Sequence, residues 1–345
     1  MGIMNRESQG KINPREANKR RRAYVAHHVT FKTAAPSTLE SSHGVSWTRQ
    51  GLLGRGGFGS VFLAETRKKT ANIHYRYQQQ QQQELPSQVA VKSATFANSL
   101  SLMHEKRVLR DLQACPHILK CYGDEVVELR SGDKVYNLLL EYCSGFNLEH
   151  WIIKSGIGLP ESHIKSYVRD ILSGLKYVHD RGYVHCDIKP CNILLVPEEE
   201  RMPTGYVAKI ADFGLAIKEE EVKKTGGSMR GTTRYMSPEL VRKKQIGYGV
   251  DIWALGCSVV EMLSGKVVWY EGEGSVNADD LLRVIGYTEY LPQLPRSVSD
   301  DALDFVLKCL CRDPVERWSA EKLLAHPFLY PEDPETWTQF FLDYR

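Results

Sequence analysis

The 345-residue sequence contains no hydrophobic run that approaches the roughly 18 apolar residues needed to cross a bilayer. A signal peptide is also missing, and Arg6 stands where a myristoylation signal requires Ser or Thr. These absences predict a soluble chain of the cytoplasm or the nucleus, with no membrane partner.

The sequence also lacks a strong excess of charge of either sign. Its 45 basic and 42 acidic residues leave a formal net charge of +3, and these charges are dispersed along the chain. A balance this small does not favour nucleic acid or a membrane surface as the main partner. Partners therefore have to be inferred from individual sites.

Paired cysteines at zinc-ligand spacing are missing as well. The eight cysteines lie mostly inside apolar or catalytic segments, which favours reduced thiols. A zinc site at residues 309–311 or 115–117 is the alternative, but no second ligand pair follows either of them. Buried or incidental thiols are the preferred interpretation.

What the sequence does contain is a cluster of polar side chains at residues 185–192, directly before an apolar strand predicted over residues 193–196. Asp187 can accept a proton, Lys189 can offset charge on a transferring phosphoryl group, and Asn192 offers an oxygen to Mg²⁺. The pattern predicts a phosphotransfer site, and a polar loop between a helix and a strand is the structural alternative.

Three further motifs occur in a fixed order around this cluster. Asp212 opens the sequence Asp-Phe-Gly after a strand predicted over residues 207–211, so a second carboxylate is placed near the first. Upstream, residues 54–61 have the spacing G-x-G-x-x-G-x-V, and Lys92 ends the strand sequence Val-Ala-Val-Lys. Each motif alone is a weak signal, but the four in this order favour phosphotransfer.

With these motifs the chain resembles the eukaryotic protein kinase domain from about residue 47 to about residue 330. The resemblance implies an α+β, two-lobed fold. The small N-terminal lobe, about residues 47–141, has an antiparallel sheet plus one helix, and the larger C-terminal lobe, about residues 144–330, is mainly helical. The resemblance also implies ATP and Mg²⁺ as cofactors, with Asn192 and Asp212 as metal ligands.

Segments outside this pattern are polar. Residues 1–46 carry the basic run 19–22 and are predicted to form a disordered arm, in which that run is either a solvated tail or a nuclear localisation signal. Residues 67–87 include six consecutive glutamines and are predicted as a disordered insertion rather than a partner-binding element. Residues 331–345 form a short C-terminal tail.

The resemblance implies further catalytic residues. Glu105, on a helix predicted over residues 99–112, is expected to pair with Lys92 and to hold it at the α and β phosphates. Thr232 is expected to bond Asp187 and Lys189.

Three other residues match structural anchors of the family. Asp251 should tie down the backbone of the catalytic loop, and Arg317 should form a buried ion pair with Glu239.

The nucleotide is expected to lie between the lobes. Backbone groups of Glu141 and Cys143 would bond adenine after a strand at residues 136–140, with Leu140 as gatekeeper, while the glycines bring backbone N–H groups close to phosphate oxygens. The residues expected around the nucleotide are Leu53, Gly54, Gly56, Gly59, Val61, Ala90, Lys92, Glu141, Cys143 and Leu194.

The catalytic loop also indicates a substrate class. Lys189, two residues after Asp187, is typical of the serine/threonine type. Residues 185–190, 231–239 and 312–329 are most similar to plant mitogen-activated protein kinase kinase kinases, which implies a mitogen-activated protein kinase kinase as the protein substrate. A serine/threonine kinase of another group is the nearer alternative. The other is a pseudokinase scaffold, which would have no need of the polar residues at all four motifs.

The resemblance fails at Cys186. The family usually has arginine there, and the planar fork of arginine is what grips a phosphate on the activation segment. The supplementary basic positions hold Ser101 and Ile217, which leaves Lys218 as the nearest expected cation.

We therefore predict that packing and Thr232 set the activation segment, and that activity depends weakly on phosphate at Thr225 or Ser228. In the alternatives, Lys218 or residues 226–227 replace the arginine, or a Cys186 thiol of low pKa acts as a redox switch.

Overall fold

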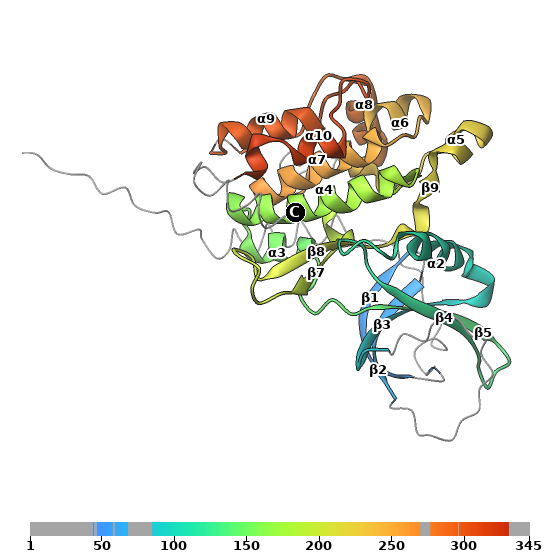
Figure 1. The fold of residues 1–345 in the computed structure, drawn as a ribbon. Helices are drawn as coiled ribbons and strands as arrows, with labels where there is room; N and C mark the ends of the chain where they lie inside the picture. The colour runs from blue at the N-terminus through green and yellow to red at the C-terminus, as the bar shows by residue number, and fades with distance from the viewer. Residues whose placement is uncertain are drawn as a thin grey trace, which may run out of the picture.

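The computed structural model describes residue 44 and residues 47–57, 59–67, 85–269, 277–295 and 297–330. The predicted N-terminal arm except residue 44, the C-terminal tail and residues 68–84 of the glutamine-rich insertion lie outside the described residues. The described chain forms two lobes, one built on a sheet and one mainly helical (Figure 1).

The small lobe is a five-stranded antiparallel sheet in the order β1-β2-β3-β5-β4. Its strands are β1 (Trp47–Gly56), β2 (Gly59–Thr66), β3 (Gln88–Thr95), β4 (Cys121–Glu128) and β5 (Lys134–Glu141). Thr66 N and Oγ1 donate to the carbonyl oxygens of Ser87 and Pro86, at 3.0 and 2.8 Å. The insertion therefore leaves and re-enters the sheet at one point.

Helix α2 (Leu100–Leu112) packs beside this sheet (Figure 1). Leu102, Val108, Leu109 and Leu112 are buried at helical spacing, and each such side chain contributes roughly 1.5–3 kcal/mol when it is removed from water. This apolar face fixes the rotation of the helix and turns Glu105 inward.

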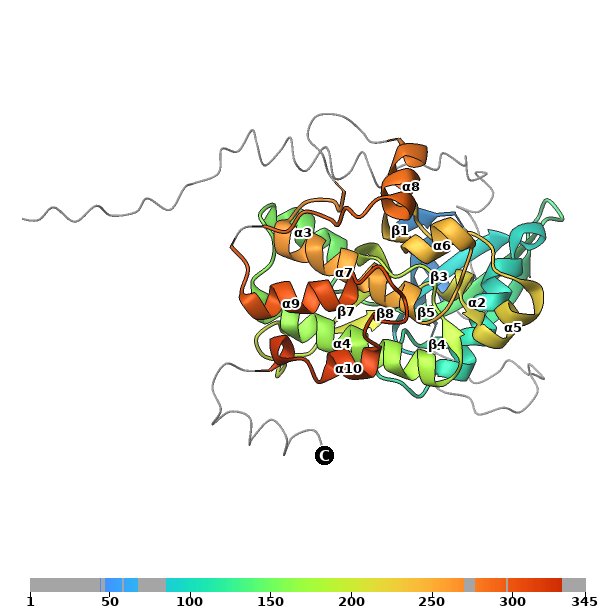
Figure 2. The ribbon, with the colours of Figure 1, turned by 90° about the horizontal axis from the view of Figure 1, so that it is seen from above.

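The large lobe is organised around two long helices, α4 (Glu161–Asp180) and α7 (Gly249–Ser264). Residues 250–263 of α7 are all buried, as their nearly uninterrupted apolar sequence predicts. Helix α10 packs on α4, α9 on α7, and α8 on α6 (Figure 2). The remaining helices are α3 (Leu148–Ser155), α5 (Glu219–Thr225), α6 (Pro238–Lys243), α8 (Ala278–Tyr287), α9 (Asp300–Cys309) and α10 (Ala320–Leu324).

Two short two-stranded sheets, one of them a hairpin, face the sheet lobe. Strands β7 (Ile193–Pro197) and β8 (Tyr206–Ile210) form one antiparallel pair, and β6 (Tyr183–Val184) and β9 (Ile217–Lys218) form the other. The residues before β7 and after β8 carry the polar motifs of the sequence, so the hairpin places both motifs at one end.

The two-lobed α+β architecture predicted from the sequence is confirmed. The predicted helix at residues 99–112 and the predicted strands at 136–140, 193–196 and 207–211 each occur within one or two residues of their expected bounds. Helix α5, in the segment after Asp212, was not predicted. Within the described part of the chain, no helix is long and apolar enough to span a membrane.

Candidate active site

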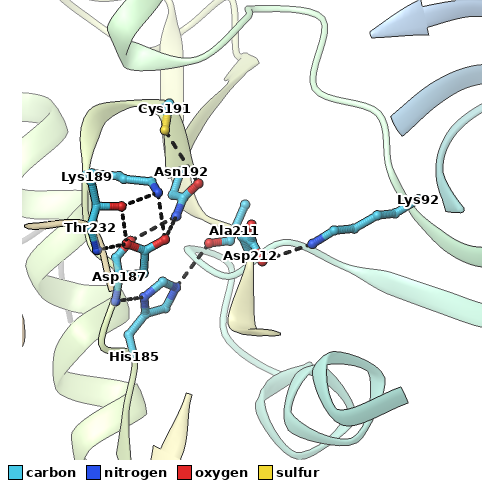
Figure 3. Close-up of polar contacts among 9 residues, drawn as sticks. All are labelled: Lys92, His185, Asp187, Lys189, Cys191, Asn192, Ala211, Asp212 and Thr232. Carbon is cyan, nitrogen blue, oxygen red and sulfur yellow. Dashed lines mark hydrogen bonds and ion pairs between the residues drawn. The ribbon is translucent and has the colours of Figure 1, made fainter. Parts of the chain in front are cut away.

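The carboxylate of Asp187 lies at the centre of a hydrogen-bonded cluster before strand β7 (Figure 3). Asp187 Oδ1 accepts from Thr232 N at 3.0 Å and Thr232 Oγ1 at 2.8 Å. Its Oδ2 lies 2.7 Å from Lys189 Nζ, which also donates to Thr232 Oγ1 at 2.7 Å. The predicted contacts of Thr232 with Asp187 and Lys189 are therefore present.

The backbone of this loop is held by Asp251 near the start of α7. The two oxygens of its carboxylate accept from His185 N and Cys186 N, both at 2.8 Å, as predicted. Asp251 Oδ2 also lies 2.9 Å from His179 Nε2. Because Asp251 is fully buried, its bonds fix the loop to the core of the large lobe.

His185 connects the loop to the second motif, a role that the sequence analysis missed. Its Nδ1 accepts from Asp187 N at 3.1 Å, and its Nε2 donates to the carbonyl oxygen of Ala211 at 3.1 Å (Figure 3). The side chain thereby spans from Asp187 to the residue before Asp212.

A second cluster joins the two lobes. Lys92 Nζ on β3 donates to Glu105 Oε2 on α2 at 2.7 Å and to Asp212 Oδ1 at 2.9 Å. Lys92 is 7% exposed and Glu105 1% exposed. Burial alone lowers the pKa of Lys92, but the charges of Glu105 and Asp212 outweigh it and raise that pKa above its ordinary value. The expected Lys92–Glu105 pair is present.

Helix α2 is held in this position by the chain that follows Asp212. His104 Nε2 donates to the carbonyl oxygen of Ala216 at 2.7 Å, and Ser101 Oγ to that of Gly214 at 3.5 Å. Asp212 itself has φ 62°, a left-handed conformation that is rare outside glycine. Its carboxylate points toward Lys92 of the other lobe (Figure 3).

The donor set around Asn192 and Asp212 fits a divalent cation. Asn192 Nδ2 donates to Asp187 O and Oδ2 at 2.9 and 3.1 Å. Among the described residues, Asn192 Oδ1 has only the Cys191 thiol as a partner, at 3.7 Å. Within the described residues, Asp212 Oδ2 has no hydrogen-bond partner. No group of three or more His, Cys, Asp or Glu there could hold a metal alone, so substrate phosphates and water would complete its coordination.

The glycines of the β1–β2 hairpin have two different structural settings. Gly59 has φ 143°, and a Cβ there would come within 2.4 Å of the Ser93 carbonyl oxygen. At Gly54 and Gly56 a Cβ would meet nothing within 4 Å. Gly59 is therefore required by the fold, whereas Gly54 and Gly56 leave the backbone open to a ligand.

The other predicted nucleotide residues lie on both lobes. Val61 is on β2, Ala90 on β3, Leu194 on β7 and Leu53, half exposed, on β1. Leu140 is buried near the end of β5, followed by Glu141 and the half-buried Cys143. Burial raises the pKa of the Cys143 thiol to about 12, which makes this thiol unreactive at neutral pH.

Glu141 carries a contact that the sequence analysis missed. Both oxygens of its carboxylate accept from Lys209 Nζ on β8, at 2.8 and 2.9 Å. Lys209 stands three residues before Asp212, and this spacing could have indicated its position.

The segment after Asp212 is anchored by an ion pair at its end and packs on an apolar cluster. The predicted ion pair of Arg317 with Glu239 anchors the end of this segment, with Nη1 to Oε1 at 2.7 Å and Nη2 to Oε2 at 3.0 Å. The apolar cluster contains Val184, Cys186, Val222, Met236, Leu240, Ile246 and Val250.

Cys186 is a core residue of that cluster. Burial raises the pKa of its thiol well above the ordinary value, which overturns the alternative of a low-pKa redox switch. The expectation that Lys218 is the nearest cation overlooked Arg230. Lys218 Nζ lies over the Tyr183 ring, 5.2 Å from its centroid, and Arg230 donates to Ser228.

Together, the two lobes, the open glycine hairpin and the paired acidic motifs define a phosphotransferase domain. A family model of the protein kinase domain matches residues 47–329. The chain therefore belongs to the protein kinase family, as its motifs predicted, and it is an enzyme of the serine/threonine type. Membership of this family implies ATP and a divalent metal ion.

Similar curated proteins come from Arabidopsis thaliana. Mitogen-activated protein kinase kinase kinase 20 is 39% identical over 289 residues, which cover 83% of this chain and 78% of that protein. Mitogen-activated protein kinase kinase kinase 18 is 37% identical over 297 residues, with 84% and 79% covered. Mitogen-activated protein kinase kinase kinase 17 is 34% identical over 285 residues, with 83% and 70% covered. The predicted resemblance to this plant group is confirmed.

Proposed function

We propose that this protein acts as a mitogen-activated protein kinase kinase kinase. It transfers the γ-phosphoryl group of ATP, bound with Mg²⁺, to serine or threonine hydroxyls of a mitogen-activated protein kinase kinase. The proposal of this substrate is supported by the names of the three Arabidopsis thaliana relatives. The proposal of Mg²⁺ is supported by the two hard oxygen donors of Asn192 and Asp212.

Asp187 is the proposed proton acceptor. As the substrate oxygen bonds to the γ-phosphorus and the bond between that phosphorus and the β–γ bridging oxygen breaks, the hydroxyl proton passes to Asp187 and ADP leaves. Lys189, 2.7 Å from Asp187, is placed to offset charge on the transferring group. Thr232 fixes the orientation of the Asp187 carboxylate through two hydrogen bonds.

Lys92 and Asp212 are the proposed phosphate and metal positions. A bound Mg²⁺ at Asp212 and Asn192 would neutralise developing charge on the phosphates. Lys92 reaches Asp212 and Glu105 together, so its ammonium is already aimed at the space where the phosphates of ATP would lie. Little reorganisation is then needed when ATP binds.

The observation that carries the proposal is the convergence of these two clusters. His185 joins Asp187 to Ala211, and the next residue, Asp212, binds Lys92 of the other lobe (Figure 3). The residues proposed as proton acceptor, metal ligands and phosphate-binding ammonium therefore belong to one connected set of contacts.

A panel assay tests the proposal. Purified protein, ATP and Mg²⁺ are incubated with catalytically inactive kinase kinases of one plant, and the phosphorylated sites are mapped by mass spectrometry. We expect phosphate on activation-segment Ser or Thr with wild-type protein and almost none with Lys92→Met or Asp212→Asn. Equal incorporation in all three would exclude the enzyme assignment.

A second variant tests the role of Asp187. Asp187→Ala should lower turnover far more than ATP affinity, because Asp187 contacts the substrate hydroxyl and not the nucleotide. Wild-type turnover in Asp187→Ala, or a parallel loss of nucleotide binding, would show that this role is wrong. Lys176→Met, on an exposed face of α4, serves as the control.

A further inference from the structure

The activation segment carries an arginine that the proposed chemistry does not use. Arg230 stands two residues before Thr232. Its Nη2 donates to Ser228 Oγ at 3.1 Å, and its Nη1 donates to the carbonyl oxygen of Leu215 at 3.3 Å. The Arg230 guanidinium thus joins Leu215, near the beginning of the segment, to a position 15 residues later in the sequence.

The residue after Arg230 packs against the catalytic loop. Gly231 has φ 98°, and a Cβ there would approach the Cys186 carbonyl oxygen to 2.3 Å, so the two backbones are in direct contact. The charge of Arg230 acts on the Cys186 thiol and lowers its pKa, although burial has the larger effect and raises it. The residue that follows Arg230 therefore contacts the one loop position where the family pattern fails.

The chemistry of arginine suits this bridging position. Its planar fork presents several N–H groups in fixed directions, so it can bond two acceptors at once, whereas lysine is a single point charge. The acceptors that Arg230 uses are a backbone carbonyl and an unmodified hydroxyl. Both are available without any covalent modification of the segment.

We infer that Arg230 is a positioning residue that closes the activation segment on the catalytic loop without a phosphate group. It acts from within the segment on Thr232, which bonds Asp187 through both its N and its Oγ1. Arg230 thereby supplies, from the segment itself, the arginine that is absent at Cys186. The inference rests on the proposed phosphotransfer function, because one of its readouts is turnover.

The test compares Arg230→Gln and Arg230→Lys with Arg283→Gln, a matched control whose side chain is 80% exposed on α8. We expect Arg230→Gln to lower kcat about tenfold or more, with an unchanged KM for ATP and an unchanged melting temperature. Arg230→Lys should restore only part of the lost turnover, and Arg283→Gln should match the wild type. Phosphatase treatment of the wild type should change kcat less than about twofold.

Hydrogen exchange over residues 215–232 provides a readout that does not depend on activity. Arg230→Gln should exchange faster there than the wild type. We expect this difference even if the wild type binds ATP but transfers no phosphate. A wild type that transfers no phosphate would contradict the proposed function alone.

Four results would overturn the inference. The first is an unchanged kcat and an unchanged hydrogen-exchange rate in Arg230→Gln, and the second is wild-type kcat in Arg230→Lys. The third is a lowered melting temperature of Arg230→Gln that accounts for its lost activity. The fourth is a tenfold loss of wild-type kcat after phosphatase treatment that rephosphorylation restores. The last result would make Arg230 a phosphate receptor. Its Nε, buried with no hydrogen-bond partner among the described residues, would then be the available donor.

Discussion

Lys209 on β8 and Glu141 at the end of β5 form a two-pronged ion pair, with Nζ–O distances of 2.8 and 2.9 Å. Glu141 Oε2 also accepts from Lys120 N at 3.2 Å. The pair joins the segment between the lobes to the strand that leads to Asp212. The region proposed to bind adenine and the carboxylate proposed to bind the metal therefore share one structural support.

Lys209→Met should weaken both folding and nucleotide binding. It leaves the mostly buried Glu141 carboxylate without its charged partner, and breaking a buried pair in this way costs about 3–5 kcal/mol of folding free energy. We expect a lower urea midpoint and a raised KM for ATP. The double variant with Glu141→Gln should recover part of the stability, because no uncompensated charge remains.

Lys176→Met is the matched control for this prediction. Lys176 pairs with Asp180 on the exposed face of α4, and the urea midpoint should hardly change. If Lys209→Met also leaves the midpoint unchanged, the Lys209–Glu141 pair does not support the fold.

Glu105→Gln should distinguish a role of Glu105 in positioning Lys92 from a role in the stability of the fold. The amide keeps the shape of Glu105 but loses the charge-assisted hydrogen bond to Lys92, which is worth about 1.5–3 kcal/mol. If Lys92 must be held at the phosphates, kcat/KM for ATP should fall roughly 10- to 100-fold, with a higher KM, a lower kcat and a folded domain. Thermal destabilisation large enough to explain the lost activity would indicate a structural role.

Alanine at two glycines of the β1–β2 hairpin should affect different properties, the stability of the domain at Gly59 and the KM for ATP at Gly56. Gly59→Ala places a Cβ 2.4 Å from the Ser93 carbonyl oxygen at a φ of 143°, so it should destabilise the domain by about 1–3 kcal/mol. Gly56→Ala meets no neighbouring atom within 4 Å. It should leave the melting temperature unchanged and raise only the KM for ATP, and equal melting temperatures for the two variants would contradict this assignment.

The sequence predicted the parts of the site that depend on short-range patterns. Asp187, Lys189 and Asn192 lie on one loop, Lys92 lies on an apolar strand and Asp212 follows another, so short sequence motifs located them. Partners that meet through tertiary packing were not visible in this way, and the Glu141–Lys209 pair joins residues 68 positions apart.

Arg230 was missed for a different reason. A cation was expected only at positions where the family usually has one, whereas Arg230 lies within the segment that it is proposed to hold. Helix α5 was missed because only Val222 is buried on it, so it has almost no apolar periodicity to detect.

Glu149, in the first turn of α3, should make stability depend on pH. Burial raises its pKa to about 7, and the charge of Lys189 lowers it only in part. The folded protein therefore binds the proton of the Glu149 carboxyl more tightly than the unfolded chain does. The protonated carboxyl stabilises the fold fully below about pH 4.5, which is the ordinary pKa of a glutamate. That contribution is lost as the pH rises through about 7.

Glu149→Gln should remove this dependence, since the amide stays neutral at every pH. We expect the variant to melt at a higher temperature than the wild type at pH 8, and the difference to shrink steadily as the pH is lowered toward 5. Glu321→Gln is the control, because the Glu321 side chain is 77% exposed and should leave the pH profile unchanged. A constant difference between Glu149→Gln and the wild type from pH 5 to pH 8 would mean that the effect comes from packing, because only a titrating carboxyl can make the difference grow with pH.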